Sequence, residues 1–145
     1  MTAPALAPDR TVLAELARAF DLTLVLRYGS RVIGHTHRES DTDIGIWRRT
    51  GSLPWKQFSE LYHRLAEILP LDQIELDLVD LWHVPGLLRH IACEQGQLLY
   101  EAAPGAFAHF RVLAWNMYQD ERTQIRRYDS LAIRAALRSL DHEPG

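Results

Sequence analysis

Residues 28–43 read Tyr-Gly-Ser-Arg-Val-Ile-Gly-His-Thr-His-Arg-Glu-Ser-Asp-Thr-Asp, and they separate two runs of strand-forming residues. The run before them, residues 22–27, is almost entirely apolar, which is typical of a strand in the interior of a sheet. The run after them, residues 44–47, reads Ile-Gly-Ile-Trp and predicts a second strand. The polar stretch is therefore interpreted as the connection between two strands of one sheet.

The two ends of this connection carry residue types that suit phosphate and metal binding. Gly29 and Ser30 lie where the first strand ends, and a glycine there permits a tight turn whose N–H groups face a phosphate. Asp41 and Asp43 are two residues apart, so a strand would point both carboxylates to one face. Such oxygen ligands suit Mg²⁺, which binds a few carboxylates together with substrate phosphates. Either half alone is equally typical of an ordinary turn or a solvated strand start, but together they indicate a nucleotidyl-transfer site.

The order Gly29-Ser30, ten residues, Asp41-Thr42-Asp43 resembles the GS-x10-DxD signature of the minimal nucleotidyltransferases, in the DNA-polymerase-β-like superfamily. The resemblance implies an α/β fold with a small mixed sheet of about four strands, flanking helices and a long C-terminal helical segment. It also implies that Asp41 and Asp43 hold two Mg²⁺ ions on the triphosphate of ATP. Gly29 and Ser30 would then cradle the phosphates.

A third carboxylate is expected from a strand over residues 74–80, where Glu75 and Asp77 alternate with apolar residues. A carboxylate within a buried strand is costly unless it is paired or binds a cation. By itself, Asp77 would be interpreted as a solvent-facing residue on an edge strand. The resemblance instead implies that Asp77 is the third acidic residue, which helps to hold the second metal and takes a proton from the acceptor. Glu75 remains the rival for this role, and Asp80 is predicted to be a cap.

Composition bounds the class of protein. The chain has 145 residues and a formal net charge of −3, so we expect one domain and no direct binding of nucleic acid. Its single cysteine, Cys93, is predicted to lie in the core and excludes an internal disulfide, which suits the reducing cytoplasm. No stretch approaches the roughly 20 apolar residues of a membrane span. We expect a cytoplasmic protein with a single domain over residues 1–145, comprising a catalytic core over about 10–103 and a helical segment over 104–140.

Apolar periodicity and capping residues predict the other elements. Asp9 is expected to cap the first helix, and Pro54 to occupy the first position of a second helix. A third helix and a last strand are predicted over residues 85–94 and 97–101. From Gly105 onward the pattern is helical, and one unbroken helix would be about 50 Å long. The sequence leaves open whether this helix breaks near residues 119–127 or projects from the domain.

The size of the chain, the surroundings of Asp77, the Leu-Tyr-Glu of the last strand and the long helical segment resemble the MntA antitoxins of HEPN/MNT toxin–antitoxin systems. This implies a Mg²⁺-dependent protein adenylyltransferase that transfers AMP from ATP to a tyrosine of a HEPN-domain ribonuclease toxin. One alternative is a nucleotidyltransferase of an aminoglycoside or metabolite, and another is an antitoxin that acts by binding alone. Three clustered carboxylates argue against binding alone. The helical segment around Tyr128, Leu131 and Ala135 is expected to dock the toxin.

Overall fold

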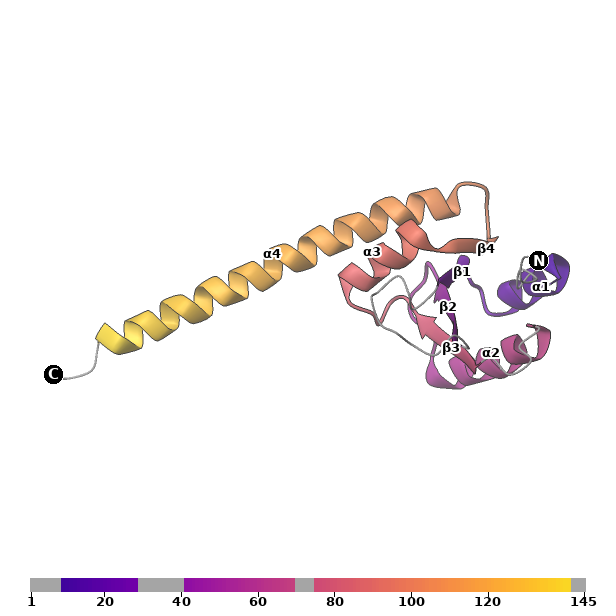
Figure 1. Ribbon diagram of the computed structural model, residues 1–145, viewed down its shortest axis with the longest axis horizontal. Coiled ribbons are helices and arrows are strands. Elements are labelled where there is room, and N and C mark those ends of the chain that lie inside the picture. The colour runs from indigo at the N-terminus through magenta and orange to yellow at the C-terminus, as the bar shows by residue number, and fades with distance from the viewer. Residues whose placement is uncertain (1–8, 29–40, 70–74, 142–145) are drawn as a thin grey trace.

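The computed structural model describes residues 9–28, 41–69 and 75–141, apart from the side chains of Asp41, Thr42, Glu75, Tyr128 and Asp141. Helices and strands are distributed along these residues in the order expected of an α/β fold (Figure 1). The elements are α1 (Arg10–Ala19), β1 (Leu24–Tyr28), β2 (Asp41–Trp47), α2 (Trp55–Ile68), β3 (Glu75–Asp80), α3 (Gly86–Gln95), β4 (Gln97–Glu101) and α4 (Ala106–Asp141).

The four strands form one mixed sheet in the order β3-β2-β1-β4. β1 is antiparallel to both of its neighbours, β2 and β4, whereas β2 is parallel to the edge strand β3. The apolar run that predicted an interior strand forms β1, and its residues Leu24, Val25 and Leu26 are completely buried. The predicted mixed sheet of about four strands is therefore confirmed, although β1 begins and ends later than residues 22–27.

Helices cover both faces of this sheet, with α1 and α2 on one face and α3 and the first half of α4 on the other (Figure 1). Side chains alternate along each strand, so neighbouring residues belong to different cores. On β1, Val25 packs in the α1/α2 core, while Leu24 and Leu26 pack in the α3/α4 core. The face that a strand residue occupies therefore follows from its register.

Helix starts agree with the capping residues, with one change of position. The carboxylate of Asp9 caps α1 by accepting a hydrogen bond from the N–H of Thr11 at 3.0 Å, as predicted. Pro54 stands one residue before α2, not at its first helical position. Leu61 and Leu65 of α2 are buried, whereas Trp55 at its start is 77% exposed. Trp55 is the first residue of α2, and its ring stacks on that of Phe58.

The C-terminal helix α4 does not break near residues 119–127, because it is one continuous helix of 36 residues. At 1.5 Å per residue it is about 54 Å long. Its first half packs along α3, and its second half projects from the domain (Figure 1). No helix in the described ranges is apolar over a length that would cross a membrane.

Candidate active site

Strand register brings the predicted acidic residues together. The parallel pairing of β2 with β3 sets Asp43 opposite Asp77, and the backbone of Asp41 opposite that of Glu75. The antiparallel pairing of β1 with β2 sets Tyr28 opposite Asp43. Tyr28, Asp43 and Asp77 therefore form a row across three neighbouring strands, which we call the acidic row. It lies on the sheet face that α3 and α4 cover, since Leu76 and Leu78 pack in the opposite core.

The two carboxylates of the acidic row differ in exposure. Asp43 lies on the inner strand β2 and is 5% exposed, whereas Asp77 lies on the edge strand β3 and is exposed. Burial and a neighbouring like charge both disfavour ionised carboxylates. A bound cation would offset both costs, and the exposed side of Asp77 provides access to it. The row is therefore suited to charged ligands that arrive from solvent.

Tyr28 and Gly45 were not predicted as parts of the site. A Cβ atom built on Gly45 would lie 3.1 Å from Cε1 of Tyr28 and 3.2 Å from Cδ2 of Leu81, so the missing side chain leaves room for the tyrosine ring. Burial, and then the negative charges of Asp43 and Asp77, raise the pKa of the Tyr28 hydroxyl above its ordinary value of 10.0. Tyr28 therefore stays neutral and keeps a donor proton beside the carboxylates. A glycine inside a strand was the available signal, because it often marks such a close approach.

Several predicted site residues cannot be placed. Gly29 and Ser30 lie outside the described residues, and so does the side chain of Asp41, although its backbone opens β2. The phosphate turn therefore stays a prediction. The same holds for the choice between Asp77 and Glu75, since only Asp77 has a described side chain.

Asp80, which was predicted to be a cap, holds a loop and a turn rather than the start of a helix, since the N-cap of α3 is Pro85. It is 7% exposed, and its carboxylate accepts hydrogen bonds from the N–H groups of Leu53 and Trp82, both at 3.0 Å. These bonds fix the loop before α2 and the turn after β3. Because Asp80 is an odd number of residues from Asp77, it faces the opposite side of the sheet and does not join the acidic row.

The described side chains agree with the requirements of Mg²⁺ in part. In the described ranges no three His, Cys, Asp or Glu side chains gather as a complete metal cage. The acidic row supplies two neighbouring carboxylates, and Mg²⁺ in nucleotide sites uses one or two carboxylates together with water and substrate phosphates. The chemistry of this donor set therefore fits a metal ion that arrives with its nucleotide.

Cys93 lies in the α3/α4 core, as predicted, and is 1% exposed. Burial raises the pKa of its thiol from 9.0 to about 12.

At pH 8 the thiolate fraction of Cys93 should then be about a thousandfold lower than that of an ordinary thiol. Disulfide reagents should label the native protein much more slowly than the same protein unfolded in urea. Because the folded-state pKa is raised, Cys93 should contribute stability below pH 9 that is lost as the pH rises toward 12. Native labelling as fast as unfolded labelling would contradict this burial.

Comparisons with known proteins place the chain in a family. The family model described as "Polymerase beta, Nucleotidyltransferase" matches residues 11–104. A chain from the crystal structure of a toxin–antitoxin complex with AMP-PNP is 27% identical with a TM-score of 0.60, and the match covers 86% of this chain and 98% of that chain. A chain from a complex of tri-AMPylated Shewanella oneidensis HEPN toxin with MNT antitoxin is 25% identical with a TM-score of 0.59, covering 86% and 95%. The comparison with curated proteins finds no match.

A further solved structure, the MntA–HepT toxin–antitoxin complex, has a chain that is 24% identical with a TM-score of 0.59, which shows a shared fold. The match to the family model extends over well over half of the sequence and includes all four strands and the complete acidic row. The predicted signature, the mixed sheet and the family model therefore agree. This chain belongs to the polymerase beta nucleotidyltransferase family and is a nucleotidyltransferase.

Proposed function

We propose that this nucleotidyltransferase is the antitoxin of a toxin–antitoxin pair and that it transfers AMP from ATP to a tyrosine of its HEPN-domain toxin. The observation that carries the proposal is the similarity to chains from two complexes, one containing AMP-PNP and the other a tri-AMPylated HEPN toxin. The matches cover 98% and 95% of those chains, so the shared part is nearly the whole of each. The acidic row supplies the matching chemistry in this chain.

The proposed reaction is attack of a tyrosine hydroxyl oxygen on the α-phosphorus of ATP. A new phosphorus–oxygen bond forms, the bond between the α-phosphorus and the bridging oxygen breaks, and pyrophosphate leaves with the bond's electron pair. The phenolic proton passes to a carboxylate, and we assign this role to Asp77 because it is exposed and lies opposite Asp43. Glu75, opposite Asp41, is the other candidate.

Asp41, Asp43 and Asp77 are the residues that would hold two Mg²⁺ ions, and Gly29 and Ser30 would contact the phosphates. When bound, Mg²⁺ supplies charge neutralisation at the attacking and leaving oxygens. The protein contributes position: Asp43 is held on the inner strand, and the buried Tyr28 beside it keeps its proton at neutral pH. This division of labour is typical of phosphoryl and nucleotidyl transfer, where catalysis is mainly positioning and charge.

The proposal predicts a metal-dependent change in the mass of the partner. The chain is incubated with the purified HEPN protein encoded by the adjacent gene, ATP and Mg²⁺, and the partner's intact mass is measured. We expect one or more added AMP units with Mg²⁺, and loss of the product when EDTA removes the metal, because the triphosphate would then meet unscreened carboxylates. Tandem mass spectrometry should place the AMP on tyrosine.

Two results would replace this function with an alternative. A partner that keeps its original mass while cells remain protected indicates an antitoxin that acts by binding alone. An unchanged partner together with nucleotidylated aminoglycoside or metabolite indicates an enzyme that acts on a small molecule. Modification that persists in EDTA would remove Mg²⁺ from the mechanism while leaving the transfer itself in place.

A further inference from the structure

The second half of α4 projects from the domain as an unsupported helix (Figure 1). We call residues 122–140 the arm. Every described side chain of the arm is exposed, including large apolar residues that are 57–65% exposed: Ile125, Leu131, Ile133, Leu137 and Leu140. At 1.5 Å per residue the arm is about 28 Å long. An isolated helix of this length is only marginally stable in water, so an exposed apolar arm indicates a surface that is covered in the functional protein.

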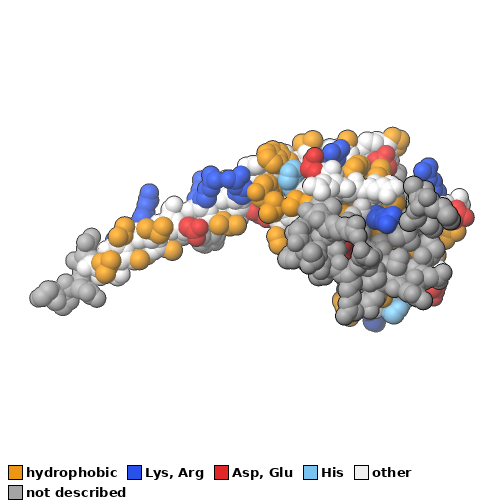
Figure 2. Space-filling model, in the orientation of Figure 1, with side chains coloured by type: hydrophobic (Ala, Val, Ile, Leu, Met, Phe, Trp, Pro, Cys, Tyr) orange, Lys and Arg blue, Asp and Glu red, His pale blue; other side chains and the backbone are white. Residues whose placement is uncertain are grey.

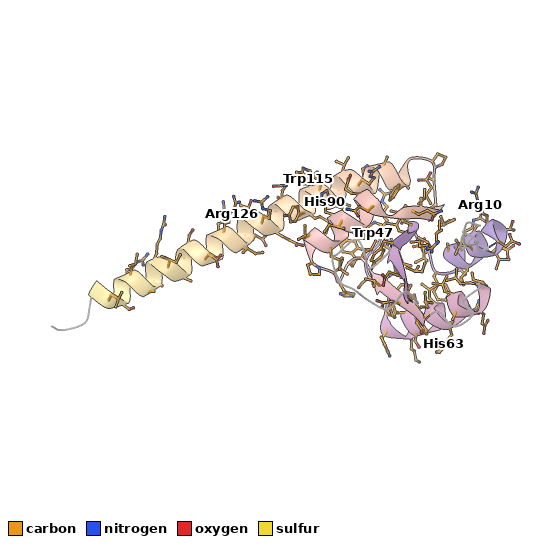
Figure 3. All side chains as sticks on the ribbon, viewed as in Figure 1. Arg10, Trp47, His63, His90, Trp115 and Arg126 are labelled. Carbon is orange, nitrogen blue, oxygen red and sulfur yellow. The ribbon has the colours of Figure 1, made fainter. Side chains whose placement is uncertain are left out.

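Several side-chain contacts hold the junction of the arm against the domain. Glu121 accepts a hydrogen bond from the N–H of Gly86 at 2.7 Å and forms an ion pair with the buried Arg89 at 3.6 Å. One turn earlier, the ring of Tyr118 stacks on His90, and Trp115 also contacts His90 with ring centroids 4.9 Å apart (Figure 3). These contacts fix the direction in which α4 leaves the domain. α3 begins at Gly86, so the stripe of α4 that packs on α3 continues into the arm with nothing described to cover it.

The arm carries two distinct sides, which Figure 2 shows as orange side chains beside a blue edge. Ile133, Leu137 and Leu140 follow one another at spacings of four and three residues, so they share one apolar side. Arg127 and Arg134 are seven residues apart, so they share a second, basic side. Arg126 lies seven residues before Ile133 and therefore borders the apolar side. Within the ranges that the structure describes, none of these three arginines forms an ion pair. A shallow hollow runs along this basic side, lined by Thr123, Arg126, Arg127, Ser130, Leu131 and Arg134.

Building on the proposed function, we propose that the arm is the docking element for the HEPN-domain partner. The partner surface that it fits is an apolar groove with carboxylates along one edge. The apolar side of the arm would enter the groove, as an amphipathic helix does, and the basic side would face the carboxylates. Docking would thus use a part of the chain that is separate from the acidic row. The arm would hold the partner while the partner's tyrosine reaches the nucleotide bound at that row.

Charge favours this occupant over a second copy of the arm. The arm contains five arginines but only one acidic residue, Asp129, whereas the whole chain has a net charge of −3. Two arms placed side by side would bring these arginines together, and like charges at an interface oppose association. An acidic partner surface would instead attract these arginines. The unequal distribution of charge along the chain is therefore accounted for by a partner of the opposite sign.

The test is a binding titration without ATP, so that docking is measured apart from transfer. The purified HEPN protein encoded by the adjacent gene is titrated with wild type, with Ile133→Glu/Leu137→Glu and with Arg127→Glu/Arg134→Glu. We expect both arm variants to bind at least about 30-fold more weakly, as is typical when central anchors of an interface are lost. Salt should weaken binding by wild type more than binding by the arginine variant.

Val112→Glu is the matched control, because Val112 lies on the same helix with 61% exposure but outside the arm. It should bind within about twofold of wild type. Glutamate has about the same helix propensity as leucine and arginine and a higher one than isoleucine and valine, so helix content and melting temperature should not fall in any variant. Far-UV circular dichroism measures both. A variant that binds the partner more weakly but keeps the wild-type melting temperature has then lost docking and not folding.

The outcomes separate this proposal from the proposed function. Weak binding by the arm variants, with wild-type transfer absent, supports the arm and overturns AMP transfer. Wild-type affinity in both arm variants overturns the arm and leaves AMP transfer in place. A wild-type dimer in light scattering that Ile133→Glu/Leu137→Glu converts to a monomer, with partner affinity unchanged, assigns the arm to a second copy and overturns the proposal. No binding by wild type overturns both.

Discussion

Asp43→Asn should reduce AMP transfer by at least about 10²–10³-fold while leaving the protein folded. Asp43 is the inner carboxylate of the acidic row, with Tyr28 and Asp77 as its cross-strand neighbours. An amide of the same shape cannot supply the negative charge that a cation and a triphosphate require. It also removes a like charge beside Asp77, so the free energy of unfolding should stay within about 1 kcal/mol of wild type or rise. Single-turnover transfer rates and urea unfolding measure the two effects separately.

Asp80→Asn is the control for Asp43→Asn, because Asp80 is also a buried aspartate of the same sheet but serves the opposite face. Its carboxylate accepts two backbone N–H groups, and an amide keeps only one acceptor oxygen. We expect Asp80→Asn to lower the free energy of unfolding by about 1–3 kcal/mol and to transfer AMP at nearly the wild-type rate once folded. Transfer by Asp43→Asn at a rate close to wild type would remove the acidic row from the mechanism.

The sequence predicted the two carboxylates of the acidic row, Asp43 and Asp77, because strand alternation is a local rule and because the resemblance supplied their roles. Two aspartates at a spacing of two must share a face, and the apolar neighbours of Asp77 fix which face it uses. Tyr28 and Gly45 were missed because their contact joins two strands, and sequence alone does not give strand pairing. The signature predicted the roles of Asp43 and Asp77, whereas the strand register showed that these two residues and Tyr28 are neighbours.

The continuity of α4 was not predictable for a related reason. The helical pattern is the same whether the helix bends back or projects, since both forms satisfy the local periodicity. Glu121 contacts Gly86 and Arg89, which lie more than 30 residues away, and these contacts hold α4 where it leaves the domain. Beyond that contact the chain offers no described surface on which the arm would fold back. The sequence therefore predicted helical residues in this segment, but not that they form one continuous, projecting helix.

Arg89 was also missed, because an arginine in a short helix is ordinarily a solvated residue. Here it is 2% exposed and lies in the first turn of α3, against the turn that joins β3 to α3. Its guanidinium donates to the carbonyl oxygens of Leu81 at 2.6 Å, Val84 at 3.1 Å and Trp82 at 3.4 Å. It also forms the ion pair with Glu121 that anchors α4. One side chain thus satisfies the carbonyl groups of a turn and ties the arm's junction to the sheet.

Arg89→Met should therefore lower the free energy of unfolding by about 3–5 kcal/mol, the range expected when one partner of a buried charged network is removed. Methionine fills similar space but removes the donor of three carbonyl oxygens and the cation that pairs with Glu121. Arg111→Met is the matched control, because Arg111 pairs with Glu94 at 3.3 Å in an ion pair whose side chains are 42% and 47% exposed. Exposed pairs contribute about 0–1 kcal/mol, so urea unfolding should separate the two variants clearly. Equal, small losses in both would show that water replaces the guanidinium at this turn, and the junction of the arm would then depend on the hydrogen bond from Gly86 to Glu121 and on the rings of His90, Trp115 and Tyr118.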